Sequence, residues 1–138
     1  MAICLTAALV SCDRQDDIDE IFIGRTWYMN GGTINGMRMN AEIKNFFVEG
    51  QPSAYSITFA ADKFTGMFRN TAPFSGKWAV DGKNHTITLT FDEKPNISSD
   101  FDHRVFNVLN KVTSYSSGAT FLTLEQDRYN SIMFGNKR

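Results

Sequence analysis

The stretch from Tyr55 to Phe91 constrains the fold most, because apolar and polar side chains alternate in it four times in succession. The alternation covers residues 55–59, 64–68, 74–80 and 87–91. A period of two with one apolar face is typical of a half-buried antiparallel strand. The stretch therefore predicts a meander of four strands, and other parts of the chain must cover its apolar face.

Further strands are expected on both sides of this meander. The segment 21–30 is rich in aromatic and β-branched residues and predicts a first strand, which Gly31-Gly32 would end with a turn. Two more strands are expected at 119–125 and 131–134. Residues 33–53 allow either a short helix or a loop that closes one end of the sheet.

One helix is expected in the C-terminal half. Val105, Val108, Leu109 and Val112 share a face over the segment 101–112, and Ser99 or Asp100 would cap its start. With 42% apolar residues in 138, the chain is large enough for one domain with a real core. We therefore expect a mainly β fold of seven or eight strands, a small antiparallel barrel or strongly curved sheet, which this helix covers. Inward-facing Gly66 and Gly76 favour tight curvature.

The N-terminal segment predicts a location. Residues 1–11 are uncharged and largely apolar, too short to span a bilayer but as long as the apolar region of a signal peptide. Leu9-Val10-Ser11-Cys12 resembles a bacterial lipobox, which implies cleavage before Cys12 and its lipidation. No Lys or Arg precedes the apolar run, so we expect the true start to lie upstream. The alternative is a buried N-terminal strand with two ordinary cysteines.

A short acidic segment follows the cysteine. Residues 13–20 carry five acids and one base and predict a solvated tether. The expected organisation is therefore a signal peptide at 1–11, a lipidated cysteine with its tether at 12–22, and one domain at 23–138. The acidic stretch loosely resembles sorting signals that send lipoproteins to the cell surface, so periplasmic and surface locations both stay open.

The order of elements resembles a known family. Phe74-Ser75-Gly76-Lys77-Trp78 and the run from Val112 to Tyr115 are similar to motifs of META domains, in a divergent form, and more broadly to small lipocalin-like bacterial lipoproteins. The resemblance extends from Gly24 to Gly135. It implies a lipocalin-like barrel in the cell envelope, in a family without an agreed enzymatic activity.

The sequence carries no pattern typical of an enzyme. His85 and His103 are the histidines of the chain, and they lack the spacing of a zinc site. The serines form no nucleophile elbow. The carboxylate pairs Asp92-Glu93 and Asp100 with Asp102 fit turns and a helix cap better than a glycosidase. We expect no catalytic residue, metal or cofactor, and the net charge of −1 gives no reason to expect nucleic acid.

Aromatic residues are the remaining candidates for a site. They could line a cavity for an apolar ligand or fill the interior of a small barrel, and core filling is the stronger interpretation. These candidates are Trp27, Tyr28, Phe64, Phe68, Phe74 and Trp78. The predicted function is a non-catalytic binding or interaction module in an outer-membrane lipoprotein, held by its lipid and in contact with a small apolar ligand or an envelope protein. A lipocalin-type carrier is the alternative, and an envelope hydrolase is a distant third.

Overall fold

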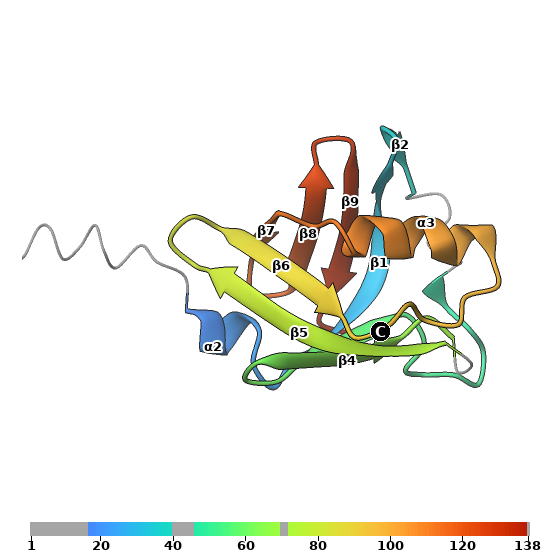
Figure 1. Cartoon of the computed structure of the whole chain (residues 1–138), viewed down its shortest axis with the longest axis horizontal. Helices are drawn as coiled ribbons and strands as arrows, with labels where there is room; N and C mark the ends of the chain where they lie inside the picture. Colours follow the sequence, from blue (N-terminus) through green and yellow to red (C-terminus); the bar gives the residue numbers. More distant parts are fainter. Residues whose placement is uncertain (1–16, 40–45, 70–71, 138) are drawn as a thin grey trace, which may run out of the picture.

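The computed structural model describes residues 17–39, 46–69 and 72–137. They form a closed antiparallel barrel of eight strands, with one further short strand and two helices (Figure 1). The strands are β1 (Thr26–Ile34), β2 (Met37–Arg38), β3 (Ser56–Phe59), β4 (Lys63–Met67), β5 (Pro73–Asp81), β6 (Thr86–Phe91), β7 (Ser114–Ser117), β8 (Phe121–Asp127) and β9 (Asn130–Gly135). The helices are α2 (Ile18–Ile21) and α3 (Asp100–Leu109).

The barrel closes where the first strand meets the last. Consecutive strands from β3 to β9 are neighbours, β1 pairs with β3 on one edge, and β1 also pairs with β9. Strand β2 lies outside this closed order and pairs with the end of β1. The predicted mainly β fold with an antiparallel barrel and a covering helix is therefore confirmed, and so is the meander, which is β3 to β6.

The expected turn at Gly31-Gly32 is wrong. Strand β1 begins later than expected, at Thr26, and continues through both glycines to Ile34. Its register against β9 shifts between Met29 and Gly31, which is a bulge that lets the strand continue after a local bend. A side chain at Gly32 would collide with the carbonyl oxygen of Ser131, so this glycine permits the close approach of β9.

The end of the expected tether is ordered. Asp17 caps helix α2 by accepting a hydrogen bond from the backbone N–H of Glu20 at 3.2 Å. Ile18 and Ile21 pack against the core, and the Phe22 side chain is fully buried. The segment from Asp17 onward is therefore part of the domain rather than a solvated tether. Cys12 and the signal-like run lie outside the described residues.

Helix α3 connects the two neighbouring strands that share the shortest pairing in the barrel. Strands β6 and β7 meet at the single residue pair Thr86 and Ser114, and α3 connects them along the chain. The helix packs against β1, β8 and β9, which places its apolar face on the barrel (Figure 1). Ser99 caps it, as one of the two expected caps, by accepting the backbone N–H of Asp102 at 3.1 Å.

Two segments show the limits of local patterns. Strand β7 was not expected, although buried Tyr115 alternates there with more exposed serines. In the segment 33–53, the described part contains the two-residue strand β2 and turns before β3, while residues 40–45 lie outside the described residues.

Candidate functional site

Aromatic side chains fill the inside of the barrel. Trp27 and Phe68 are fully buried, and Phe64 is 1% exposed. Phe64 lies 6.4 Å from Phe59 and 5.1 Å from Phe91 between ring centroids, and Phe68 lies 5.2 Å from Phe74. Rings at these separations are in direct contact. The interior positions that we predicted as a possible ligand cavity therefore pack against one another.

Trp78 lies at the end of the barrel next to helix α2. Its ring is half-buried and contacts Phe22 at 5.2 Å and Phe59 at 5.0 Å between centroids. Its indole N–H donates to the carbonyl oxygen of Ala60 at 2.9 Å. Since Phe22 follows α2 directly, the ordered N-terminal segment covers this end of the interior.

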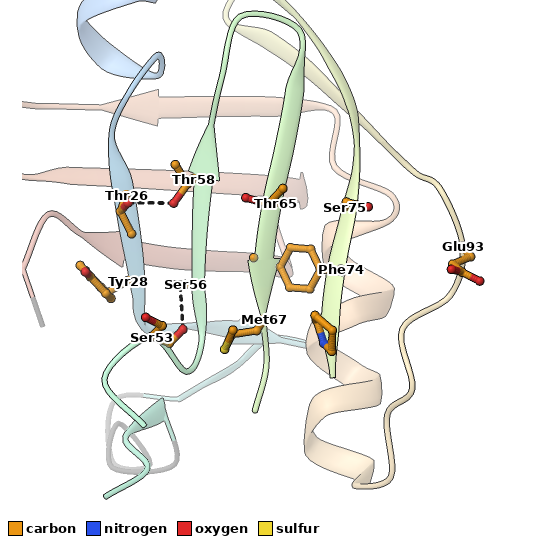
Figure 2. A pocket seen from close by; sticks show the side chains of 12 residues that line it. Thr26, Tyr28, Ser53, Ser56, Thr58, Thr65, Met67, Phe74, Ser75 and Glu93 are labelled. Atoms are coloured by element: carbon orange, nitrogen blue, oxygen red, sulfur yellow. Dashed lines mark hydrogen bonds between the residues drawn. The ribbon is translucent and has the colours of Figure 1, made fainter. Parts of the chain in front are cut away.

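Tyr28 faces the opposite way from its neighbour Trp27, because successive side chains of a strand point to opposite faces. It lines an open hollow of about 600 Å³ on the outer wall of the barrel (Figure 2). The hollow covers strands β1, β3, β4 and β5 and is lined by Thr26, Tyr28, Ser53, Ser56, Thr58, Thr65, Gly66, Met67, Pro73, Phe74, Ser75 and Glu93.

Strand register arranges these lining residues in two rows. Thr26, Thr58, Thr65 and Ser75 are direct partners across the four strands, and Figure 2 shows them in one line. Direct partners on one face have Cβ atoms about 4.5–5.5 Å apart. The neighbouring row, two residues along each strand, consists of Tyr28, Ser56, Met67 and Pro73.

Several hydroxyl protons in the hollow already have an acceptor. The Oγ1 atoms of Thr26 and Thr58 are 2.7 Å apart, so one of them donates to the other. Ser56 donates to the carbonyl oxygen of Ser53 at 2.7 Å, and Ser75 donates to Asp92 at 2.9 Å. None of the described lining residues is Lys or Arg. The hollow therefore presents hydroxyl groups and no lining cation to solvent.

A second hollow differs from it in charge. It has a volume of about 400 Å³ and lies between the β1–β2 hairpin and the start of α3. Arg38 and Arg104 line it together with Asp100 and several apolar side chains. The larger hollow is thus the less basic of the two.

A buried polar cluster joins α3 to the barrel. The phenol of Tyr55, which is fully buried, donates to Asp102 Oδ1 at 2.7 Å, and Asp102 is 2% exposed. Arg69 Nε lies 3.6 Å from Asp102 Oδ2, and its own side chain is 45% exposed. Burial, followed by the hydrogen bond to Asp102, raises the pKa of Tyr55 well above its ordinary value. Tyr55 also has a φ of 58°, in the left-handed region that non-glycine residues rarely adopt.

The sequence did not reveal this cluster. Tyr55 was assigned to the apolar face of a strand and Asp102 to a helix cap, and the two residues are far apart in the chain. The carboxylate of Asp102 is contacted by both the phenol and the guanidinium. Its arrangement fixes the helix on the barrel.

The other polar candidates lie apart. Asp92 accepts a hydrogen bond from Ser75, whereas Asp100 is exposed at the start of α3. The two carboxylate pairs therefore do not face one common site. His85 lies in the turn before β6 with a φ of 58° and its ring 5.7 Å from that of Tyr115. Within 17–39, 46–69 and 72–137, no three His, Cys, Asp or Glu side chains come together as metal ligands. In the same residues, no helix has the length and apolar character needed to cross a membrane.

Comparisons with known proteins agree with the fold. A crystal structure of a DUF4847 family protein from Bacteroides vulgatus ATCC 8482 matches 88% of this chain and 98% of its own, with a TM-score of 0.70 and 21% identity. A second protein, known from an NMR structure, matches 83% of this chain and 91% of its own, with a TM-score of 0.55 and 15% identity. At such identities the likeness shows the fold alone.

The family follows from the sequence match. No curated protein matches the chain significantly. The expected likeness to META domains and lipocalin-like lipoproteins stays a prediction. A family model described as a domain of unknown function, DUF4847, matches residues 13–136. Because this match covers nearly all of the chain, the protein belongs to the DUF4847 family.

Proposed function

We propose that this protein is a non-catalytic binding module of the bacterial cell envelope, anchored by a lipid on Cys12, and that it binds its ligand on the outer wall of the barrel. The observation that carries the proposal is the contrast between the two faces of one wall. The inner face of β1, β3, β4 and β5 is filled by packed aromatic rings, whereas the outer face is hollowed and lined by hydroxyl groups.

The packed interior argues against the alternative of a lipocalin-type carrier. A site that encloses a small apolar ligand needs a cavity of several hundred cubic ångströms. Phe64 contacts rings from three other strands, so an apolar ligand at that position would have to displace them. The outer hollow needs no such rearrangement.

The lipobox-like segment supports the anchor. Residues 9–12 carry the required order of an aliphatic residue, two smaller positions and cysteine. Since α2 starts directly after Asp17, at most five residues separate it from Cys12, a reach of roughly 17 Å when fully extended. The proposed anchor would hold the barrel close to the membrane surface, as expected of an envelope lipoprotein of the META or lipocalin-like type.

The chain offers a matched pair of variants for the anchor. Expressed from its own gene, Cys12→Ser should lose incorporation of an alkyne-labelled fatty acid and leave the membrane fraction. Cys4→Ser should remain lipidated and membrane-bound. Label retained by Cys12→Ser, or label absent from the unmodified protein, would refute lipidation at Cys12.

The binding wall is tested by what the protein retains from its envelope. Native mass spectrometry of the purified protein should show a bound ligand that is lost from Thr65→Arg, because the long cationic side chain would enter the middle of the hollow. Thr88→Arg is the control, since Thr88 is also an exposed threonine on the outer face of the barrel but lies outside the hollow. A ligand lost equally from both variants, or from neither, would contradict binding in the hollow.

A further inference from the structure

We propose that the outer hollow is a carbohydrate site and that its ligand is a neutral glycan. The hydroxyl groups of the glycan lie along the row of Thr26, Thr58, Thr65 and Ser75, and a C–H face of the sugar packs against the row of Tyr28, Ser56, Met67 and Pro73. This inference rests on the proposed function and names the class of ligand.

The size of the hollow suits a short oligosaccharide. Three strand spacings separate Thr26 from Ser75, which is about 15 Å along the hydroxyl row. The volume of about 600 Å³ lies within the usual range of ligand sites. The hollow is open on one side, so a longer chain could extend beyond it.

The hydroxyl row has open hydrogen-bond acceptors, which the hydroxyl groups of a sugar can satisfy. The protons of Ser56 and Ser75 are used inside the protein, and the Thr26–Thr58 pair shares one between its two oxygens. Oxygen lone pairs therefore remain along the row, and the hydroxyl of Thr65 makes no hydrogen bond to the described residues. A buried acceptor left without a donor costs about 1–3 kcal/mol, so a fully apolar ligand such as an acyl chain fits poorly.

Charge disfavours an acidic ligand. Glu93 lines the hollow, and Asp92 accepts from Ser75 at its rim. Lys63 and Lys77 lie one row further along β4 and β5 and are not among the lining residues. A phosphate, sulfate or uronate in the hollow would therefore meet a lining carboxylate and no lining cation.

The second row explains why the ligand should be a sugar rather than a simple polyol. It places the ring of Tyr28 and the apolar groups of Met67 and Pro73 beside the polar row. Sugar rings carry hydroxyl groups at their edges and C–H groups on their faces, and aromatic rings with one polar end suit such a surface. The hydroxyl row thus matches the hydroxyl groups at the edge of a pyranose, and the partly apolar row matches its C–H face.

The test uses the mature lipoprotein in a detergent without a sugar headgroup. An array of immobilised neutral oligosaccharides, with glucans, mannans, galactans and xylans, is compared with acidic ones that contain sialic acid, uronic acid or sulfate. We expect binding to at least one neutral class and none to the acidic glycans. Calorimetry with the best neutral ligand then measures the affinity of the variants.

Single substitutions should act according to their place in the rows. Thr58→Val and Thr65→Val keep the side-chain shape and remove a hydroxyl, so each should weaken binding three- to tenfold, and Tyr28→Ala should weaken it by at least tenfold. Thr88→Val, outside the hollow, should bind as the unmodified protein does. Binding only to acidic glycans, binding to no neutral glycan, or affinities unchanged in all three hollow variants would each overturn the inference.

The two proposals can fail separately. If the protein retains an envelope ligand that Thr65→Arg releases, but binds no neutral glycan, the hollow is a binding site for another class and the carbohydrate inference is wrong. If Thr65→Arg and Thr88→Arg behave alike and no glycan binds, the hollow is not the binding wall and both proposals fail.

Discussion

Replacing Tyr55 by phenylalanine tests whether the buried cluster fixes α3 on the barrel. The substitution removes one oxygen atom and leaves the ring, its packing and the backbone unchanged. The lost group is a phenol that donates to a buried carboxylate at 2.7 Å. Asp102 would keep the guanidinium of Arg69 as its side-chain partner, at 3.6 Å from a half-exposed side chain.

The expected cost follows from burial. A hydrogen bond to a charged group contributes about 1.5–3 kcal/mol, and Asp102 at 2% exposure has little water to replace the phenol. We therefore expect Tyr55→Phe to lower the free energy of unfolding by about 1.5–3 kcal/mol. For a domain of this size the midpoint of thermal unfolding should fall by roughly 6–12 °C.

Urea unfolding followed by circular dichroism measures this change, with Tyr129→Phe as the matched control. Tyr129 is 51% exposed, so its substitution should change the free energy of unfolding by less than about 0.5 kcal/mol. A cycle with Asp102→Ala should give a coupling energy of about 1.5 kcal/mol or more between the two side chains. A Tyr55→Phe protein as stable as the original, or a coupling energy near zero, would refute the reasoning.

Three further predictions concern the same framework. The raised pKa of Tyr55 means that the folded state holds the phenol proton more tightly than the unfolded state does, so the free energy of unfolding should fall as the pH rises above about 10, by up to about 1.4 kcal/mol per pH unit. Urea unfolding at several alkaline pH values measures this dependence, and Tyr55→Phe should lack the contribution of the phenol. The same dependence on pH in both proteins would contradict burial of the phenol. Gly76→Ala would place a methyl group against a carbonyl oxygen of β6 and 2.7 Å from the Phe64 ring. It should lower the free energy of unfolding by more than the roughly 1–2 kcal/mol expected for Gly24→Ala, where only the φ of 79° opposes a side chain. An equal loss of stability in the two variants, measured by thermal unfolding, would contradict the close packing at Gly76. Ser99→Ala should destabilise the protein by about 1 kcal/mol through loss of the α3 cap, and Ser99→Asp should restore most of it.

Local patterns were sufficient for the parts of the fold that depend on near neighbours. The alternation between 55 and 91 identified four strands and their inward faces, since a period of two is a property of the strand itself. The cap at Ser99 and the apolar face of α3 were readable for the same reason. Short elements were missed, because the four residues of β7 are too few for a clear period and α2 lies within an acidic segment.

Long-range register explains what the sequence could not provide. Thr26, Thr58, Thr65 and Ser75 are ordinary outward-facing strand residues when read one strand at a time. They become a row only through pairing across four strands. The contact between Tyr55 and Asp102 likewise depends on where α3 lies, and nothing next to Tyr55 in the chain indicates its left-handed backbone.

Under the proposed function, the two faces of the barrel wall separate stability from binding. Every residue of the hydroxyl row has a core residue beside it in sequence: Trp27 follows Thr26, Ile57 and Phe59 flank Thr58, Phe64 precedes Thr65, and Phe74 precedes Ser75. The core neighbours are at most 6% exposed, so substitutions there affect packing. On the outer face, Thr65 is exposed and the other three hydroxyl residues are half-buried. Substitutions at a surface usually change stability by less than about 0.5 kcal/mol. Residues of the outer hollow can therefore be replaced with little loss of stability. A binding module needs this property if related proteins are to recognise different ligands on the same fold.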